Sequence, residues 1–322
     1  MKYLVTGGAG FIGSNIIERL LELGHSVVSL DNFATGKREN LAAFETNPNF
    51  ESIEGDIRSF ETCNQACEGI DIVLHQAALG SVPRSINDPA TSNEVNITGF
   101  LNMLIAAKEQ QSVRRFVYAA SSSTYGDSNG LPKVEDVIGK PLSPYAVTKY
   151  VNELYADVFS KTYGVECIGL RYFNVFGPRQ DPDGAYAAVI PKFISLFLKG
   201  ESPTINGDGS ISRDFTYIDN VVQANLLAAE TQNPEAVNQV YNIAFGDSTS
   251  LNEMVEVLKQ KLAQFKPEVS DIEVHHGADR MGDIKHSLAS IDKAKRLLKY
   301  DPKFSFSKGV EKSVKWYFEN LS

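Results

Sequence analysis

The chain has 322 residues, which exceeds the roughly 100 to 200 residues of a typical domain, so we expect one large unit and a smaller partner. Hydrophobic residues make up 43% and charged residues 22%, a balance that excludes disordered and collagen-like chains. A net charge of −9 disfavours nucleic acids and anionic membranes as partners. The three cysteines lack metal-ligand spacing, and no apolar run approaches the roughly 18 residues of a membrane span, so we expect a protein of the reducing cytoplasm without disulfides or zinc.

The first part of the chain alternates strands and helices. A strand is predicted over 2–6, a glycine-rich turn follows over 7–13, and apolar residues at helical spacing then run to Leu23. A second strand over 26–31 completes a βαβ unit. The further predicted strands cover 50–54, 70–75, 116–120, 166–172 and 240–244, with helical stretches between most of them. This alternation predicts an α/β fold with a Rossmann-type, doubly wound parallel sheet.

The pattern loosens after Asn174, where prolines and Gly184 mark loops. A helix is predicted over 189–198, and the chain beyond Leu251 is predicted to be helical with one extended piece over 272–276. We interpret this part as a smaller C-terminal α/β domain built on the carboxyl edge of the sheet.

Three glycines spaced three residues apart occupy the turn over 7–13. Such glycines let the backbone turn sharply and let a pyrophosphate approach the helix N-terminus, although the glycines alone also fit a turn without a ligand. Asp31 ends the second strand, where an acid accepts the two ribose hydroxyls of an adenosine and repels a 2′-phosphate. This arrangement favours NAD over NADP. Asp56 ends the third strand, where it either binds the adenine amino group or is a solvated loop acid.

Tyr145 and Lys149 are one helical turn apart, so the Lys149 ammonium can favour the phenolate form of Tyr145. Three serines over 121–123 end the strand over 116–120, and a serine hydroxyl there can hold a substrate oxygen whose proton moves. Taken alone, Tyr145 is more simply an ordinary aromatic residue at a helix start. The combination with the glycine turn predicts proton transfer beside a nicotinamide.

Together these residues resemble the extended short-chain dehydrogenase/reductases that act on nucleotide sugars. The resemblance runs nearly end to end and also rests on Arg171-Tyr172-Phe173-Asn174-Val175-Phe176-Gly177-Pro178. The stretches 75–85, 184–191 and 212–215 are most similar to the UDP-N-acetylglucosamine 4-epimerases of bacterial polysaccharide pathways. The resemblance implies a nucleotide-sugar 4-epimerase with tightly held NAD. Its Tyr145 phenolate would take the proton of the sugar 4-hydroxyl while C4 delivers hydride to NAD, and the 4-keto sugar would turn over and take the hydride back.

The resemblance also implies the residues of the site. The catalytic residues would be Ser121, Ser122, Ser123, Tyr145 and Lys149, with the principal serine left open. The residues expected to contact NAD are Gly7, Gly10, Phe11, Ile12, Gly13, Asp31, Asn32, Asp56, Ile57, Gln76, Ala77, Ala78, Asn96, Tyr145, Lys149 and Tyr172. The residues expected to contact the UDP-sugar are Ser81, Arg84, Ser121, Ser123, Tyr145, Asn174, Ala187, Ala188, Val189, Lys192, Asn206, Arg213, Arg280, Asp283 and Ser287. Arg213 and Arg280 would neutralise the diphosphate, with surface salt bridges as the alternative.

The resemblance further implies how the chain is divided and assembled. Residues 1–178, with 214–246 returning, would form the NAD-binding domain, and residues 179–213 with 247–322 would form the UDP-sugar-binding domain. Two apolar helix stripes would bury against the sheet or against a partner chain. They comprise Leu101, Leu104 and Ile105, and Val151, Leu154, Tyr155 and Val158. Such helices pair between subunits in this family, so we expect a homodimer.

Ser287 bears on the choice of sugar, because in this family a small residue at its position goes with enzymes that also accept N-acetylated sugars. It predicts UDP-GlcNAc and UDP-GalNAc as preferred substrates, with UDP-glucose and UDP-galactose as further ones. The alternative is that Ser287 is the N-cap of a helix around 291–298. Gly80 stands where many UDP-galactose 4-epimerases have a lysine, a cofactor contact that this chain replaces or lacks.

Other functions stay open from the sequence. A 4,6-dehydratase needs an acid/base pair after the catalytic hydroxyl, where this chain has Ser122 and Ser123. A UDP-glucuronate 4-epimerase or decarboxylase needs an extra cation, which Arg84 could supply. A non-catalytic protein that binds NAD or nucleotide sugars is the third alternative, and the presence of Tyr145 and Lys149 argues against it.

Overall fold

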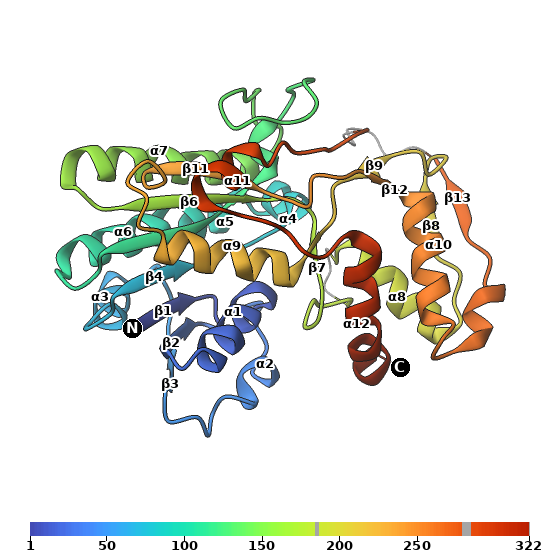
Figure 1. Ribbon diagram of the computed structural model, residues 1–322, viewed down its shortest axis with the longest axis horizontal. Helices are drawn as coiled ribbons and strands as arrows, with labels where there is room; N and C mark the ends of the chain where they lie inside the picture. The colour runs from blue at the N-terminus through green and yellow to red at the C-terminus, as the bar shows by residue number, and fades with distance from the viewer. Residues whose placement is uncertain (184–186, 279–284, 322) are drawn as a thin grey trace.

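The computed structural model describes residues 1–183, 187–278 and 285–321 (Figure 1). Its centre is a seven-stranded sheet with the strand order β11-β6-β5-β4-β1-β2-β3. Every neighbouring pair in this sheet is parallel. The strands are β1 (Lys2–Thr6), β2 (Ser26–Asp31), β3 (Phe50–Glu54), β4 (Ile72–His75), β5 (Arg115–Ser121), β6 (Cys167–Tyr172) and β11 (Gln239–Ile243). The predicted Rossmann-type parallel sheet is therefore confirmed: β1, β2 and β3 have the predicted bounds, and the ends of the other four strands differ from the predicted ones by at most two residues.

Helices cover the sheet on both faces, which is why its inner strands are apolar on both sides. Val5, Leu74 and Val117 face a core shared with α1 and α9, whereas Leu4, Val73 and Phe116 face a core shared with α3 and α6. Helix α7 also contacts β5 and β6. The bounds are α1 (Phe11–Glu22), α3 (Phe60–Ala66), α6 (Phe100–Glu109), α7 (Pro144–Tyr163) and α9 (Ile218–Glu230).

A second group of elements lies beyond the carboxyl ends of the strands, on the right of Figure 1. It includes α8 (Val189–Lys199), α10 (Leu251–Leu262) and α12 (Phe306–Leu321), which contact one another. Three short strand pairs accompany them, formed by β7 (Val175–Phe176), β8 (Thr204–Asn206), β9 (Ser212–Arg213), β10 (Thr216–Tyr217), β12 (Thr249–Ser250) and β13 (His275–Gly277). The extended piece predicted over 272–276 is in part β13, which pairs with β8. The predicted boundaries of the two domains stay a prediction.

Short helices complete the described chain. They are α2 (Glu39–Ala42), α4 (Val82–Asn87), α5 (Pro89–Asn93), α11 (Asp292–Leu298), a π-helical turn (Glu94–Gly99) and 3-10 turns at Ser122–Tyr125 and Pro267–Asp271. None of the helices that the structure describes has the length and apolar character to cross a membrane.

Candidate active site

The glycine turn between β1 and α1 is shaped by contacts that only glycine permits. Gly7 has a φ of 67°, and a Cβ atom on it would lie 2.8 Å from the backbone of Ala77. A Cβ atom on Gly13 would lie 2.2 Å from the Gly7 carbonyl oxygen. The turn therefore packs against both the start of α1 and the segment after β4, and it leaves backbone N–H groups at the helix N-terminus for an anionic ligand.

A cavity of about 380 Å³ lies over this turn, at the carboxyl ends of β1 to β4. This is where the order of the sheet reverses between β1 and β4, the place where open α/β sheets bind ligands. The predicted cofactor residues that line the cavity are Gly7, Gly10, Phe11, Ile12, Gly13, Asp31, Asn32, Ile57, Gln76, Ala77 and Ala78. Sequence reasoning missed other lining residues, namely Leu30, Ala34, Thr35, Gly55, Arg58, Leu79, Thr91 and Val95. Gly80, where many UDP-galactose 4-epimerases have a lysine, also lines the cavity, and a Cβ atom on it would meet no atom within 4 Å.

Asp31 is almost buried, with 8% of its surface exposed. Its carboxylate accepts hydrogen bonds from the backbone N–H groups of Ala9 at 2.9 Å and Phe33 at 2.8 Å. Burial raises the pKa of Asp31, and these two hydrogen bonds oppose that shift. The acid therefore holds the glycine turn and retains acceptor capacity toward the cavity.

Asp56 lies beside the same cavity and is held by its neighbours. Its carboxylate accepts hydrogen bonds from Asn32 and Arg58, both of which line the cavity. The hydrogen bonds from Arg58 and Asn32 lower the pKa of Asp56 to about 2, against a smaller effect of burial. Asp56 therefore stays ionised and fixes two residues of the cavity wall.

Asn96 and Tyr172 lie behind the cavity wall rather than on it. Asn96 accepts a hydrogen bond from the Leu79 N–H group at 2.7 Å and donates to the Thr148 hydroxyl at 3.1 Å. The Tyr172 hydroxyl donates to the Gln76 side chain at 3.0 Å. These polar groups thus support Leu79 and Gln76, which line the cavity.

Tyr145 is the second residue of α7, and its phenol lies near Ser121 at the end of β5. Burial raises the pKa of Tyr145, and the interaction with the Ser121 side chain opposes the shift. Lys149 lies one turn further along α7, buried, and donates to the Ala119 carbonyl oxygen at 3.0 Å. Burial lowers the pKa of Lys149 to about 8. The structure therefore brings the three predicted groups to the edge of β5.

Of the three serines, Ser121 is the one whose hydroxyl is contacted by the polar groups of another, Ser123. Its hydroxyl oxygen accepts hydrogen bonds from the Ser123 N–H group at 3.2 Å and from the Ser123 hydroxyl at 2.9 Å. Ser122 begins the 3-10 turn that follows. The geometry therefore favours Ser121 as the hydroxyl that meets Tyr145, a choice that the sequence left open.

The predicted sugar-site residues fall on several elements. Ser81 is the N-cap of α4, with a φ of 104°, and accepts a hydrogen bond from the Arg84 N–H group. Ala187 precedes Ala188, which is the N-cap of α8; Val189 begins that helix, and Lys192 is exposed in its first turn. Asn206 is exposed at the end of β8.

Arg213, Asn174 and Ser287 lie near the junction with the second group of elements. The Arg213 guanidinium donates to the Lys285 carbonyl oxygen, and the Ser287 N–H group donates to the Ser212 carbonyl oxygen at 3.1 Å. Asn174 donates to the Asp214 carbonyl oxygen at 3.0 Å. Ser287 is not a helix N-cap, because α11 begins at Asp292 and its N-cap is Ile291. The predicted substrate residues Arg280 and Asp283 lie outside the described residues.

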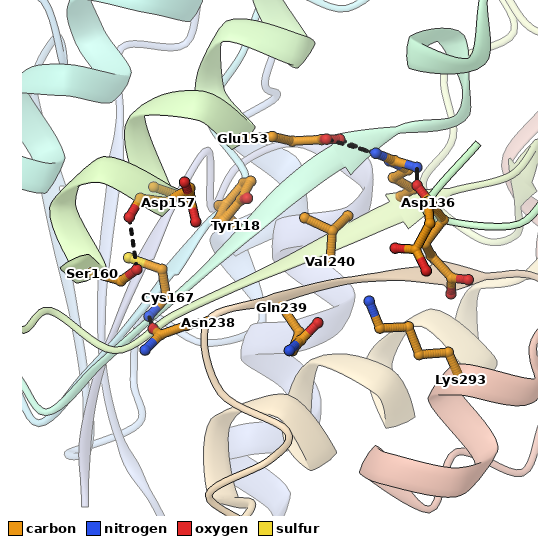
Figure 2. A pocket seen from close by; sticks show the side chains of 13 residues that line it. Tyr118, Asp136, Glu153, Asp157, Ser160, Cys167, Asn238, Gln239, Val240 and Lys293 are labelled. Carbon is orange, nitrogen blue, oxygen red and sulfur yellow. Dashed lines mark hydrogen bonds and ion pairs between the residues drawn. The ribbon is translucent and has the colours of Figure 1, made fainter. Parts of the chain in front are cut away.

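A second pocket of about 220 Å³ lies between α7, β6 and β11 (Figure 2). Its wall contains an ion pair that the sequence did not predict: Arg171 donates to both carboxylate oxygens of buried Glu153, at 2.8 and 2.7 Å. Arg171 is thereby engaged in tying β6 to α7. No three His, Cys, Asp or Glu side chains gather as a metal site within the described ranges.

The comparisons with known proteins agree with this geometry. The model of the "NAD dependent epimerase/dehydratase family" matches residues 3–244. The putative UDP-glucose 4-epimerase of Methanocaldococcus jannaschii is 36% identical over 319 residues, covering 98% of each chain. The UDP-N-acetylglucosamine 4-epimerase of Methanobrevibacter ruminantium, solved with UDP-N-acetylmuramic acid, is 40% identical with a TM-score of 0.91, covering 99% of this chain and 98% of the other. The UDP-glucuronic acid 4-epimerase of Bacillus cereus, solved with UDP-glucuronic acid and NAD, is 33% identical with a TM-score of 0.89 and 99% coverage of each chain.

Proposed function

The chain belongs to the NAD dependent epimerase/dehydratase family, and we propose that this NAD-dependent UDP-sugar 4-epimerase interconverts UDP-N-acetylglucosamine and UDP-N-acetylgalactosamine. The observation that carries the 4-epimerase chemistry is the convergence of Tyr145, at the start of α7, and Ser121, at the end of β5, with buried Lys149 one helical turn away. The sugar specificity rests on Ser287, next to the strand that carries Arg213.

The cavity fits NAD. Its glycine turn offers backbone N–H groups to a pyrophosphate, and Asp31 at the end of β2 keeps acceptor capacity for ribose hydroxyls. When bound, NAD supplies a hydride acceptor and donor for C4 of the sugar.

The chain's own residues move the proton of the 4-hydroxyl. Tyr145, as phenolate, accepts that proton, and the Ser121 hydroxyl orients the oxygen that loses it. Lys149 lies on the same helix face, and a positive charge there would favour the phenolate of Tyr145, which burial disfavours.

The preference for N-acetylated sugars is supported by the size of Ser287. A sugar that turns over in the site must clear its 2-substituent in both orientations, and a small side chain leaves room for an N-acetyl group. The Methanobrevibacter ruminantium relative is named for UDP-N-acetylglucosamine.

The test of this preference is Ser287→Tyr, with Ser287→Ala as the size-matched control. The tyrosine should abolish turnover of UDP-GlcNAc and spare UDP-glucose, whereas the alanine should turn over both. Equal loss on both substrates in Ser287→Tyr, or no loss on either, would remove Ser287 as the determinant.

UDP-glucuronate is the second candidate substrate, since relatives named UDP-glucuronate 4-epimerase are 33–34% identical. The observation on this chain is Arg84, a cation on α4 three residues after Ser81. Arg84→Met separates the candidates: it should abolish turnover of UDP-glucuronate if that sugar is the substrate and leave turnover of UDP-GlcNAc nearly unchanged.

A further inference from the structure

We propose that Ser85 is a positioning residue that fixes Tyr145 for proton transfer, through a hydrogen bond from the Tyr145 backbone N–H group to the Ser85 hydroxyl. The inference rests on the proposed function of Tyr145 as the base. The bond joins residues 60 positions apart in the sequence, and its N–O distance is 2.9 Å.

The bond satisfies a group that α7 cannot satisfy itself. The first N–H groups of a helix have no partner within the helix, and Tyr145 is the second residue of α7. The Ser143 side chain accepts the N–H group of Ala146 at 3.1 Å, and Ser85 takes that of Tyr145 from another helix. Ser85 is fully buried, so water cannot replace it.

Ser85 also connects Tyr145 to the segment expected to meet the sugar. Its hydroxyl donates to the Val82 carbonyl oxygen at 2.7 Å, in the first turn of α4. The Ser85 N–H group donates to the carbonyl oxygen of Ser81, the N-cap of α4. A shift of α4 is therefore transmitted to the backbone of Tyr145.

A second link restrains the other side of the same residue. The Thr148 hydroxyl donates to the Tyr145 carbonyl oxygen at 2.8 Å and accepts a hydrogen bond from Asn96, which holds Leu79. Both backbone polar groups of Tyr145 are thus tied to the segment 79–85. Of the two links, only the hydrogen bond from the Tyr145 N–H group to Ser85 is direct, and a single substitution of Ser85 removes it.

Loss of this tie should affect the rate more than substrate binding. A misplacement of about 1 Å at a reacting group can lower a rate by as much as about 100-fold. For Ser85→Ala we expect kcat to fall roughly 10- to 100-fold, with KM for the UDP-sugar and the NAD content of the purified protein nearly unchanged.

The matched control is Ser92→Ala. Ser92 is as buried as Ser85, and its hydroxyl donates to the Asp88 carbonyl oxygen within the neighbouring helix at 2.9 Å. Both substitutions remove a buried serine hydroxyl and should lower Tm, Ser85→Ala by more because it also leaves the Tyr145 N–H group unpaired. Only Ser85→Ala should lower kcat and move the pH–rate profile.

The outcomes separate this inference from the proposed function. If the wild-type chain epimerises a UDP-sugar and Ser85→Ala has the kcat and pH profile of Ser92→Ala, the role of Ser85 is wrong and that of Tyr145 stands. If the wild-type chain epimerises no UDP-sugar, both fail. Should Ser85→Ala not fold, Ser85→Cys keeps the size and weakens the acceptor: a lower kcat at unchanged KM supports the inference, and an unchanged kcat overturns it.

Discussion

The Lys149 ammonium donates a hydrogen bond to the Ala119 carbonyl oxygen over 3.0 Å, two residues before Ser121 on β5. Lys149 is 3% exposed, and burial lowers its pKa to about 8. At neutral pH the ammonium is therefore charged and largely removed from water. This placement costs stability, and it puts a positive charge one helical turn from Tyr145.

We predict that Lys149→Met stabilises the cofactor-free protein at pH 7 while abolishing epimerisation. The folded pKa of about 8 lies below the ordinary value of 10.5, so the unfolded chain binds more protons between these values. The free energy of unfolding of the wild type should therefore rise between pH 8 and pH 10.5 and stay at its lower value below pH 8. Methionine removes the cost of burying the ammonium but leaves the Ala119 carbonyl unpaired, for a net gain in stability on the order of 1–2 kcal/mol. Urea unfolding at pH 7 and pH 10 tests this; a less stable variant at pH 7 would contradict it.

Tyr145→Phe should slow epimerisation by at least about 100-fold, because the phenyl ring cannot accept the proton of the 4-hydroxyl. The backbone bonds of Tyr145 to Ser85 and Thr148 do not involve the phenol, so folding and NAD content should stay at wild-type levels. The check is turnover of UDP-GlcNAc together with the NAD released on denaturation. Near-normal turnover would exclude Tyr145 as the base.

Asp31→Ala should lose bound NAD and accept NADP better than the wild type does. The substitution removes the acceptor for ribose hydroxyls and the negative charge that repels a 2′-phosphate. It also frees the N–H groups of Ala9 and Phe33, which should loosen the glycine turn. Cofactor content after gel filtration and titration with each dinucleotide measure the effect, and unchanged NAD content would count against this role.

His75 should make the protein sensitive to acid. It is buried beside the Thr6 hydroxyl, and burial lowers its pKa to about 3. The ordinary pKa of histidine is 6.5, so between pH 6.5 and about 3 the side chain is protonated in the unfolded chain but not in the folded chain. The free energy of unfolding therefore falls as the pH drops through this range. His75→Phe should flatten this decline, since the ring contacts of Phe100 and Phe116 accept an aromatic side chain.

Chemical unfolding of His75→Phe between pH 7 and pH 4 provides the measurement. The control is His275→Phe, because the His275 ring is exposed to water in the folded chain as it is in the unfolded chain. An acid limb as steep in His75→Phe as in the wild type would show that other groups set it.

The homodimer stays a prediction, and an exposed stripe on α7 supports it. The stripe consists of Val147, Leu154 and Val158, which are 46%, 49% and 51% exposed. Leu154 and Val158 follow Val147 by seven and eleven residues, so all three lie on one face of the helix. The double variant Leu154→Glu with Val158→Glu should be a monomer in light scattering at micromolar concentration. A wild-type monomer under those conditions would refute the dimer.

The sheet could be predicted from the sequence because each of its inner strands is a short apolar run buried on both faces and followed by a helix. The turn over 7–13 and Asp31 were also predictable, because each follows or ends a predicted strand and the carboxyl ends of parallel strands meet at one edge of the sheet. The two-residue strands β7, β9, β10 and β12 were not, since two residues carry no alternation.

The contacts that fix the site were also beyond the sequence. Ser85 and Tyr145 are 60 residues apart, and Glu153 and Arg171 are brought together by the packing of α7 on β6. No local spacing signals such pairs, because they depend on how helices are placed on the sheet. The choice among Ser121, Ser122 and Ser123 required the geometry of the 3-10 turn.

The most direct test of the account is epimerisation of UDP-N-acetylglucosamine in D₂O, followed by proton NMR. If Tyr145 moves only the hydroxyl proton and the C4 hydrogen travels as hydride, UDP-N-acetylgalactosamine should form with protium retained at C4 and no net NADH. Deuterium at C4 would contradict the hydride route. Failure to convert UDP-N-acetylglucosamine while UDP-glucose or UDP-glucuronate is converted would contradict the proposed substrate.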